Sequence, residues 1–309
     1  MPAGCAPSVG RMIEADALTK RYGGKTAVDG LSFTVRPGQV TGFLGPNGAG
    51  KSTTMRMIIG LDRPNGGRVT VAGRPYREHP APLREVGSLL EAKAIHKGRT
   101  ARAHLLGLAQ THGIPARRVD EVLGMVGLEA VAGRRAGGFS LGMSQRLGIA
   151  TALLGDPAAV ILDEPVNGLD PDGVLWIRTL LKSLAAEGRT VLVSSHLMSE
   201  MAVTAEHLII IGRGRLLADT TLDDLIARVG VGSVLVRSPD GTRLRDALVA
   251  RDATVTETEV GLLRVTGLAA EGIGDLAFRH GIAVHELTPQ RASLEQAYME
   301  LTRETLEYR

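Results

Sequence analysis

The sequence predicts an α/β protein with a mainly parallel β-sheet, followed by a smaller α+β domain. Two apolar runs, "AAVILDEP" (158–165) and "TVLVSSH" (190–196), are typical of buried strands. The segment between them, Leu175–Ala186, has the apolar spacing of a helix. This β-α-β order indicates parallel strands. After about residue 225 the order changes to βαββαβ plus a terminal helix, which is the split βαβ arrangement.

The first 150 residues add short strands and then helices. The strands expected within residues 12–45 include "LSFTV" (31–35) and "VTGFL" (40–44), with a Pro-Gly turn between them. A helix is expected from Lys51, and "DRPNGG" (62–67) is rich in turn residues. Residues 83–150 lose strand character, and their apolar spacing predicts helices at 101–112, at 117–128 and from Leu141 onward.

The last 84 positions, 226–309, are expected to form the separate domain. Its predicted strands are "SVLVRS" (233–238), "ATVTETE" (253–259), "LLRVTG" (262–267) and "IAVHEL" (282–287). Its predicted helices cover 244–252, 273–281 and 293–304.

Composition narrows the class of protein. A net charge of +3 without a Lys/Arg run gives no case for nucleic-acid binding. Cys5 is the only cysteine, which excludes an internal disulfide and a cysteine-based metal site and fits a reducing, cytosolic compartment. The most apolar stretches are far shorter than the roughly 20 residues of a bilayer span. Residues 1–11 are expected to be a flexible tail without a signal peptide, and Met12 is an alternative start.

A phosphate-binding loop is predicted at "GPNGAGKS", Gly45–Ser52, because it stands between a predicted strand and a predicted helix. Its glycines allow backbone N–H groups to turn inward around an anion. Lys51 is expected to reach the β- and γ-phosphates, and the Ser52 hydroxyl to bind Mg²⁺.

Two adjacent carboxylates follow a buried strand in "VILDE" (160–164). With a phosphate-binding loop upstream, Asp163 is expected to hold Mg²⁺, and Glu164 to orient and deprotonate the attacking water.

A second candidate anion site lies in "FSLGMSQRLGIA" (139–150), where Ser140 and Gly142 stand at the start of a helix. Three further features have an ordinary and a functional interpretation. His196 is a polar strand end or a γ-phosphate contact, "NGLDP" (167–171) is a turn or an interface loop, and Tyr22 is a loop aromatic or an adenine platform.

Taken in order over residues 12–225, these features resemble the nucleotide-binding subunit of an ATP-binding-cassette (ABC) transporter. "FSLGMSQRLGIA" and "ILDEPVNGLDP" are similar to the exporter subgroup of bacitracin- and lantibiotic-resistance ATPases. "SLEQAYMELT" resembles the accessory domain of daunorubicin-type resistance ATPases. The resemblance implies a P-loop NTPase core with an antiparallel β-subdomain and a helical subdomain at about 92–150, plus the α+β domain at 226–309.

The resemblance also implies two cassettes that pair head to tail around ATP. Ser140 and the Gly142 N–H would then cover the γ-phosphate held by the partner, and Asp170 would contact the partner. Glu164 would be the base, His196 the γ-phosphate sensor and Tyr22 the adenine contact. The expected ATP-binding loop comprises Gly45, Pro46, Asn47, Gly48, Ala49, Gly50, Lys51, Ser52 and Thr53.

Two departures from the family pattern stand out. Leu141 and Met143 replace a glycine and a glutamine of the usual Leu-Ser-Gly-Gly-Gln, while Ser140 and Gly142 are kept. Glu91 stands where the family generally has a glutamine that reaches Mg²⁺ and the attacking water. The expected metal ligands are therefore Ser52, Asp163 and Glu91, since a carboxylate also binds Mg²⁺.

The expected function is the ATP-hydrolysing subunit of an exporter, a homodimer or heterodimer on the cytoplasmic face of the membrane. Residues 92–105 would face a separately encoded permease. The alternative is a soluble ABC ATPase that acts on ribosomes or nucleic acid, which the single cassette, the lack of sustained heptads and the small charge disfavour. The C-terminal domain would stabilise the dimer or dock the permease, or else bind a regulatory ligand.

Overall fold

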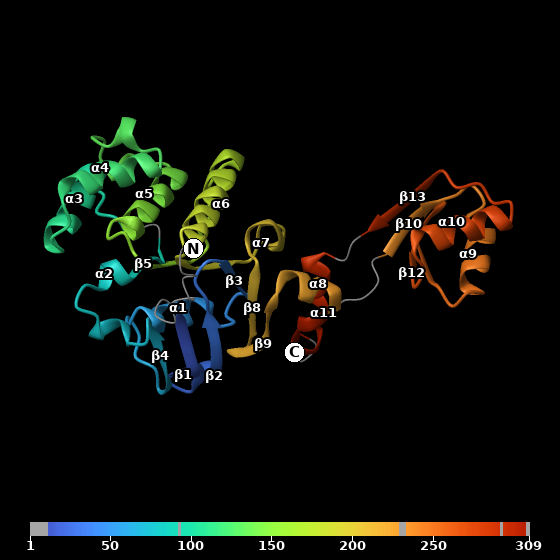
Figure 1. Cartoon of the computed structure of the whole chain (residues 1–309), viewed down its shortest axis with the longest axis horizontal. Coiled ribbons are helices and arrows are strands. Elements are labelled where there is room, and N and C mark those ends of the chain that lie inside the picture. The colour runs from blue at the N-terminus through green and yellow to red at the C-terminus, as the bar shows by residue number, and fades with distance from the viewer. Residues whose placement is uncertain (1–11, 92–93, 229–232, 291–292, 307–309) are drawn as a thin grey trace, which may run out of the picture. The chain divides into compact units, whose positions relative to one another are not determined.

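The structure, a computed structural model, describes residues 12–91, 94–228, 233–290 and 293–306. The chain divides into two compact units, Met1–Thr221 and Leu222–Arg309, coloured from blue to red along the chain in Figure 1. The tail expected at residues 1–11, with Cys5, lies outside the described residues, as do residues 92–93 of the segment expected to face a permease.

A six-stranded sheet forms the centre of the first unit. Its strand order is β5-β6-β7-β3-β8-β9, and every neighbouring pair is parallel except β8 and β9. Its strands are β3 (Val40–Leu44), β5 (Val86–Leu89), β6 (Ala159–Leu162), β7 (Thr190–Ser195), β8 (His207–Gly212) and β9 (Arg215–Thr221). Every residue of β3, β6 and β7 is buried, as expected of strands that helices cover on both faces. The mainly parallel sheet predicted from the apolar runs is confirmed.

Among the helices between these strands are α1 (Lys51–Ile58), α2 (Pro82–Glu85), α6 (Pro171–Ala186) and α7 (Met198–Thr204). Helix α6 makes the crossover between the parallel strands β6 and β7. It buries an apolar stripe of Ile177, Leu181 and Leu184, spaced three and four residues apart.

A second sheet of three antiparallel strands, in the order β2-β1-β4, packs on the central sheet. Its strands are β1 (Ile13–Tyr22), β2 (Lys25–Val35) and β4 (Gly66–Val71). The rings of Phe33 and Phe43 lie 5.6 Å apart in the core between the two sheets. β1 and β2 are longer than the short strands predicted here. A register shift between Ala15 and Leu18 spans Ala17, where φ is 47°, and lets β1 continue while its polar-apolar alternation slips.

Helices α3 (Ala101–Thr111), α4 (Ala116–Met125) and α5 (Leu141–Leu153) form a group beside the central sheet (Figure 1). Short 3₁₀ turns are η1 (Tyr76–Glu78), η2 (Glu129–Val131) and η3 (Ala136–Gly138). The prediction that residues 83–150 lack strand character is wrong, because β5 lies within them. β5 has four residues, two of which are Gly87 and Ser88, so its pattern is weak. Gly87 is required by packing, since a Cβ there would collide with the Ala152 carbonyl oxygen of α5.

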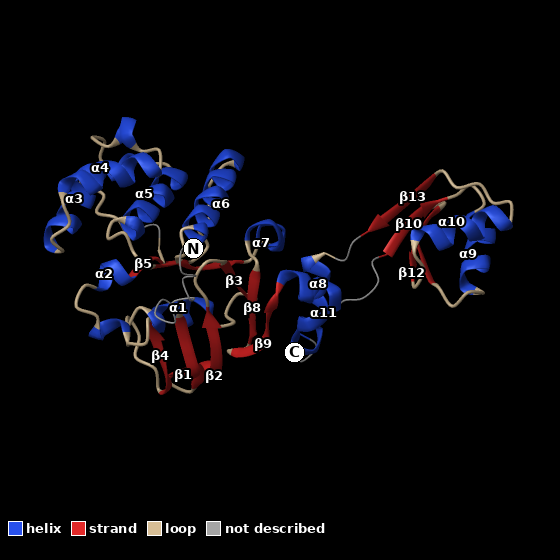
Figure 2. Ribbon diagram, viewed as in Figure 1, coloured by secondary structure: helices blue, strands red, loops and turns tan. Residues whose placement is uncertain are grey.

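The second unit contains an antiparallel sheet of order β11-β12-β10-β13, with α9 and α10 on one face (Figure 2). Its strands are β10 (Ser233–Arg237), β11 (Thr254–Glu259), β12 (Leu262–Thr266) and β13 (Glu286–Gln290). Its helices are α8 (Leu222–Arg228), α9 (Gly241–Val249), α10 (Ala270–Arg279) and α11 (Leu294–Leu306), with α8 packed against α11. The α+β class is as predicted.

The strand predicted at 282–287 is displaced in the structure, where β13 begins at Glu286. The Ile282 N–H still bonds to the Ala277 carbonyl oxygen (2.9 Å), so this part of the predicted strand closes α10. β13 is an edge strand that contains Pro289, which its position at the edge permits. None of the described helices combines the length and apolarity needed to cross a bilayer.

Candidate functional site

The loop between β3 and α1 is shaped to surround an anion. Gly48 and Gly50 have φ of 80° and 106°, a region that favours glycine. A Cβ on Gly50 would also stand 2.6 Å from the Ala27 carbonyl oxygen, so this position requires glycine twice over. Helix α1 begins at Lys51 without a side-chain cap. The N–H groups of its first turn are therefore available to a ligand.

Lys51 is a buried cation, with 7% of the residue exposed. Its Nζ donates to the carbonyl oxygens of Gly45 (2.6 Å) and Pro46 (3.4 Å). Burial lowers the pKa of the Lys51 ammonium group, and the negative charges of Glu164 and Asp163 oppose that shift. The group is thus a partly desolvated positive charge at the mouth of the loop, where it can attract phosphate.

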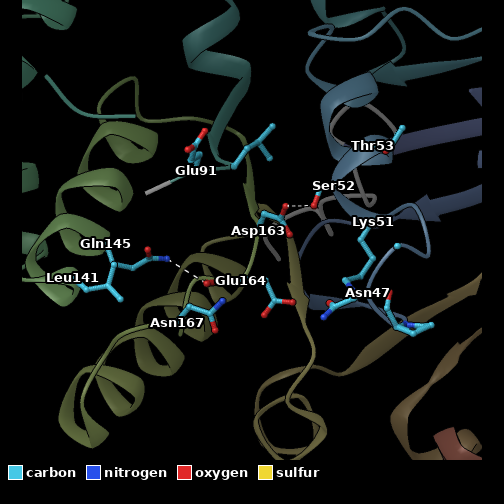
Figure 3. Close-up of a pocket in the computed structure, with 13 residues that line it drawn as sticks. Asn47, Lys51, Ser52, Thr53, Glu91, Leu141, Gln145, Asp163, Glu164 and Asn167 are labelled. Carbon is cyan, nitrogen blue, oxygen red and sulfur yellow. Dashed lines mark hydrogen bonds between the residues drawn. The ribbon is translucent and has the colours of Figure 1, made fainter. Parts of the chain in front are cut away.

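Ser52 meets Asp163 from another part of the chain, as Figure 3 shows. The Ser52 Oγ donates to Asp163 Oδ2 (2.6 Å), and the Ser194 hydroxyl of β7 donates to the other carboxylate oxygen. A hydroxyl and a carboxylate oxygen side by side are the hard ligands that Mg²⁺ prefers. The predicted ligands Ser52 and Asp163 are thus brought together in a way that fits this cation. Among the described residues, no group of three or more His, Cys, Asp and Glu side chains forms a protein-only metal site.

Glu164 is held at its N–H and at its carboxylate. The N–H donates to Ser194 Oγ (2.9 Å), and the carboxylate Oε2 lies 2.7 Å from the His196 ring Nδ1. An ionised carboxylate only accepts hydrogen bonds, so the imidazole donates. The backbone of Glu164 has φ of 50°, a left-handed conformation that is strained for a non-glycine residue. The structure therefore pairs the two side chains that the sequence predicts as base and γ-phosphate sensor.

Lys51, Ser52, Asp163 and Glu164 line a pocket of about 410 Å³ (Figure 3). The predicted residues that line it are Pro46, Asn47, Gly48, Lys51, Ser52, Thr53, Glu91, Asp163 and Glu164. Four lining residues were not predicted: Leu90, Leu141, Gln145 and Asn167. Leu141 and Gln145 come from the first turns of α5, which brings the helical group to the edge of this pocket.

The other predicted residues do not line this pocket. Gly45, Ala49 and Gly50 belong to the backbone of the loop without lining the pocket, and His196 contacts the pocket only through its hydrogen bond to Glu164. Ser140 caps α5 by accepting from the Met143 N–H (3.2 Å), and Asp170 caps α6 by accepting from the Gly173 N–H (2.9 Å). Gly142 packs closely, since a Cβ there would stand 3.1 Å from the Gly168 carbonyl oxygen.

Tyr22 ends β1 instead of lying in a loop, and 48% of it is exposed. Its hydroxyl donates to Asp62 Oδ2 (2.7 Å), and Lys20 Nζ lies 5.0 Å from the ring centroid. Burial and the bond to Asp62 raise the pKa of Tyr22, while the Thr53 hydroxyl opposes the shift. Thr53 also lines the pocket, so the Tyr22 hydroxyl lies close to one residue of the pocket wall.

Two functional residues missed by the sequence prediction had weak local signals. Ser194 bridges Asp163 and Glu164, yet in the sequence it is only a polar residue at the end of an apolar run. Gln145 is 3% exposed in a helix whose neighbours are mostly apolar. A buried amide of this kind needs hydrogen-bond partners, and that need was the available signal.

Comparisons with known proteins agree with this geometry. Residues 28–167 match the family model described as ABC transporter, and residues 232–295 match a domain of unknown function (DUF8746). The chain is 39% identical over 298 residues to the bacitracin transport ATP-binding protein BcrA of Bacillus licheniformis, covering 94% of this chain and 97% of the relative. It is 34% identical over 314 residues to the linearmycin resistance ATP-binding protein LnrL of Bacillus subtilis (strain 168), covering 96% and 99%.

A solved structure supports the same similarity. The dimeric structure of MJ0796, described as a bacterial ABC transporter cassette, matches with a TM-score of 0.63 at 25% identity. The match covers 68% of this chain and 98% of that chain. The resemblance predicted from the order of the motifs is confirmed.

Proposed function

This chain belongs to the family of ABC transporter ATP-binding proteins, and from that premise we propose that it powers an exporter formed with a separately encoded membrane permease. As a member of the family it is an ATPase that hydrolyses ATP for transport. The finer steps below concern this chain's own residues and partners.

The observation that carries the proposal is the convergence of Lys51, Ser52, Asp163 and Glu164 on one pocket. Lys51 would pair with the β- and γ-phosphates, while the N–H groups of the loop from Gly45 to Gly50 bind the phosphate oxygens. Thr53 and Tyr22 would lie on the nucleoside side, with the Tyr22 ring stacked on adenine.

Ser52 and Asp163 would hold Mg²⁺, with Glu91 as a further oxygen donor. When bound, Mg²⁺ neutralises charge on the β- and γ-phosphates. Because Ser52 and Asp163 already lie 2.6 Å apart, these two ligands need little rearrangement.

Glu164 would take a proton from water as the water oxygen forms its bond to the γ-phosphorus. The bond from that phosphorus to the bridging oxygen breaks, and ADP leaves with the bridging oxygen's electron pair. His196, whose ring is hydrogen-bonded to the Glu164 carboxylate, would orient that carboxylate and contact the γ-phosphate.

Two cassettes would close head to tail on two ATP molecules, as a homodimer or with a similar ATPase. Ser140 and the Gly142 N–H would cover the partner's γ-phosphate, and Asp170 would lie at the interface. A helix N-terminus and a hydroxyl favour this contact only while the phosphate charge is present, so hydrolysis would open the dimer.

Export is proposed because the relatives are named for bacitracin transport and linearmycin resistance. The subunit would lie on the cytoplasmic face of the membrane, and residues 92–105, which follow Glu91 in the sequence, would contact the permease. We expect no nucleic-acid partner. Co-purification from native membranes with a multi-span protein supports this assembly, and recovery of the chain alone contradicts it.

The chemistry is tested with Glu164→Gln and Lys51→Ala. Glu164→Gln should bind Mg-ATP, lose hydrolysis and persist as a closed dimer in solution scattering, because the amide cannot accept the proton. Hydrolysis by Glu164→Gln at the unmutated rate would show that another group is the base.

Lys51→Ala should weaken nucleotide binding itself, because it removes the buried charge.

A further inference from the structure

Gln145 connects helix α5 to the loop that carries Glu164. Its Nε2 donates to the carbonyl oxygens of Pro165 (3.0 Å) and Glu164 (3.4 Å), and Figure 3 shows the bond to Glu164. Only 3% of Gln145 is exposed. Hydrogen bonds from a buried amide to two successive carbonyl groups fix the path of that backbone.

The bonds of Gln145 complete the support of a strained residue. Glu164, with φ of 50°, is held at its N–H by Ser194 and at its carboxylate by His196. Both of those partners lie on or just after β7. Gln145 holds the carbonyl side of Glu164 from α5, which is a different element. Left-handed backbone at a non-glycine residue persists only when its surroundings determine it in this way.

A second contact joins α5 to the same loop further along the chain. The side chain of Leu141, on the first turn of α5, packs on Gly168, where any added Cβ would collide with it. The segment from Glu164 to Gly168 is therefore tied to α5 near both of its ends. Movement of α5 must change the backbone that aims the Glu164 carboxylate.

We propose that Gln145 is a positioning residue that makes the aim of Glu164 depend on the position of α5. The inference rests on the proposed function, in which Ser140 at the start of α5 covers the partner's γ-phosphate. Closure on the partner's nucleotide then places α5, and α5 places the base for the nucleotide of its own chain. Hydrolysis at one site becomes coupled to occupancy of the other.

The test uses two substitutions of Gln145. Gln145→Met keeps the volume and removes both donors, so kcat should fall by about 10- to 100-fold, as expected when a catalytic group is misplaced by a fraction of an ångström to 1 Å. The Kd for Mg-ATP should stay within about twofold, because Gln145 bonds neither the phosphate-binding loop nor Asp163. The matched control is Thr151→Val on the same helix, which removes only the bond from Thr151 Oγ1 to the Leu147 carbonyl oxygen (3.0 Å) and should leave kcat unchanged.

Gln145→Glu separates hydrogen bonding from packing. Burial raises the pKa of a carboxyl group, and only its protonated form donates to a carbonyl oxygen. The ratio of the Gln145→Glu rate to the unmutated rate should therefore rise as pH falls from 8 to 6. A ratio that does not change with pH would overturn the hydrogen-bonding role.

Two further results would overturn the proposal. Unchanged kcat in Gln145→Met, or loss of ATP binding together with kcat, overturns the positioning role. Glu164→Gln is measured in the same assay. If that variant is inactive while Gln145→Met is fully active, the inference alone fails, whereas an active Glu164→Gln removes the proposed base itself.

Discussion

The net charge of the side chains that line the pocket depends on a few individual residues. Among its 13 described lining residues, Lys51 is the only cationic side chain, and three carboxylates, Glu91, Asp163 and Glu164, also line the pocket. A triphosphate adds further negative charge. Binding therefore depends on loop N–H groups, on Lys51 and on Mg²⁺ between Ser52 and Asp163.

Glu91→Gln tests how much of this balance rests on Glu91. We expect ATP turnover to stay within about twofold of the unmutated rate, because Ser52 and Asp163 supply the two closest oxygens and an amide oxygen also binds Mg²⁺. Removal of one like charge should leave Mg-ATP affinity equal or higher. Steady-state kinetics and nucleotide titration measure both. A fall to the background rate would mean that the Glu91 charge itself is required.

Asp62 provides a pH-dependent contribution to stability near Tyr22. Hydrogen bonds from Arg56 and from Tyr22 lower the pKa of its carboxyl group. A folded-state pKa below the unfolded value of about 3.9 stabilises the fold above that value, and the contribution is lost as pH falls through the folded pKa. Asp62→Asn should therefore lower the thermal midpoint at pH 7 by more than at pH 3.

The matched variant Tyr22→Phe removes one of the two bonds to Asp62 and keeps the ring. We expect a smaller loss of stability at pH 7 and unchanged ATP affinity, because stacking on adenine does not need the hydroxyl. Equal effects of Asp62→Asn at both pH values would contradict the assignment of its stabilising role to the ionised form.

At the level of elements, the N-terminus of α5 has a structural and a proposed functional role that can be separated. Ser140→Ala should remove the cap bond to Met143, with a loss of about 1 kcal/mol of stability, and should also weaken ATP-driven dimer formation. Thr100→Ala is the control, since Thr100 caps α3 through the Ala103 N–H (3.1 Å). It should show a similar change in unfolding and no change in dimerisation by scattering. Equal loss of dimer in both variants would refute a specific contact by Ser140.

Elements were predictable where local pattern and tertiary role coincide. The apolar runs of β6 and β7 predict buried strands, and the glycine-rich sequence before α1 predicts a turn. Lys51, Ser52 and Asp163 stand in motifs that predict a phosphate and Mg²⁺ site, and all three line one pocket. β5 was missed because Gly87 is selected by the close approach of α5, not by strand preference. Ser194 and Gln145 were missed because they hydrogen-bond the Asp163–Pro165 segment from other elements, and a polar residue among apolar neighbours does not reveal which segment it will bond.

For the whole molecule, the residues that line the pocket and the residues of the second unit come from separate parts of the sequence. All lining residues of the pocket lie between Pro46 and Asn167. The core of the second unit is formed by its own strands and helices, including Val236, Leu248 and Ile273. Each part therefore buries its own apolar surface, which is the physical requirement for independent folding.

A chain that ends at Thr221 tests this division. We expect it to fold and to bind Mg-ATP with a Kd within about twofold of the full chain, because it keeps the loop, Lys51, Ser52 and Asp163. The second unit is proposed to stabilise the dimer or to dock the permease, so the truncated chain should associate more weakly in scattering or co-purify less with the permease. Residues 222–309 expressed alone, followed by circular dichroism during heating, provide the matched control for folding. Loss of ATP binding by a folded truncated chain would contradict the division. If the truncated chain forms the dimer and co-purifies with the permease as well as the full chain does, a regulatory, ligand-binding role for the second unit is favoured, because neither assembly contact then depends on it.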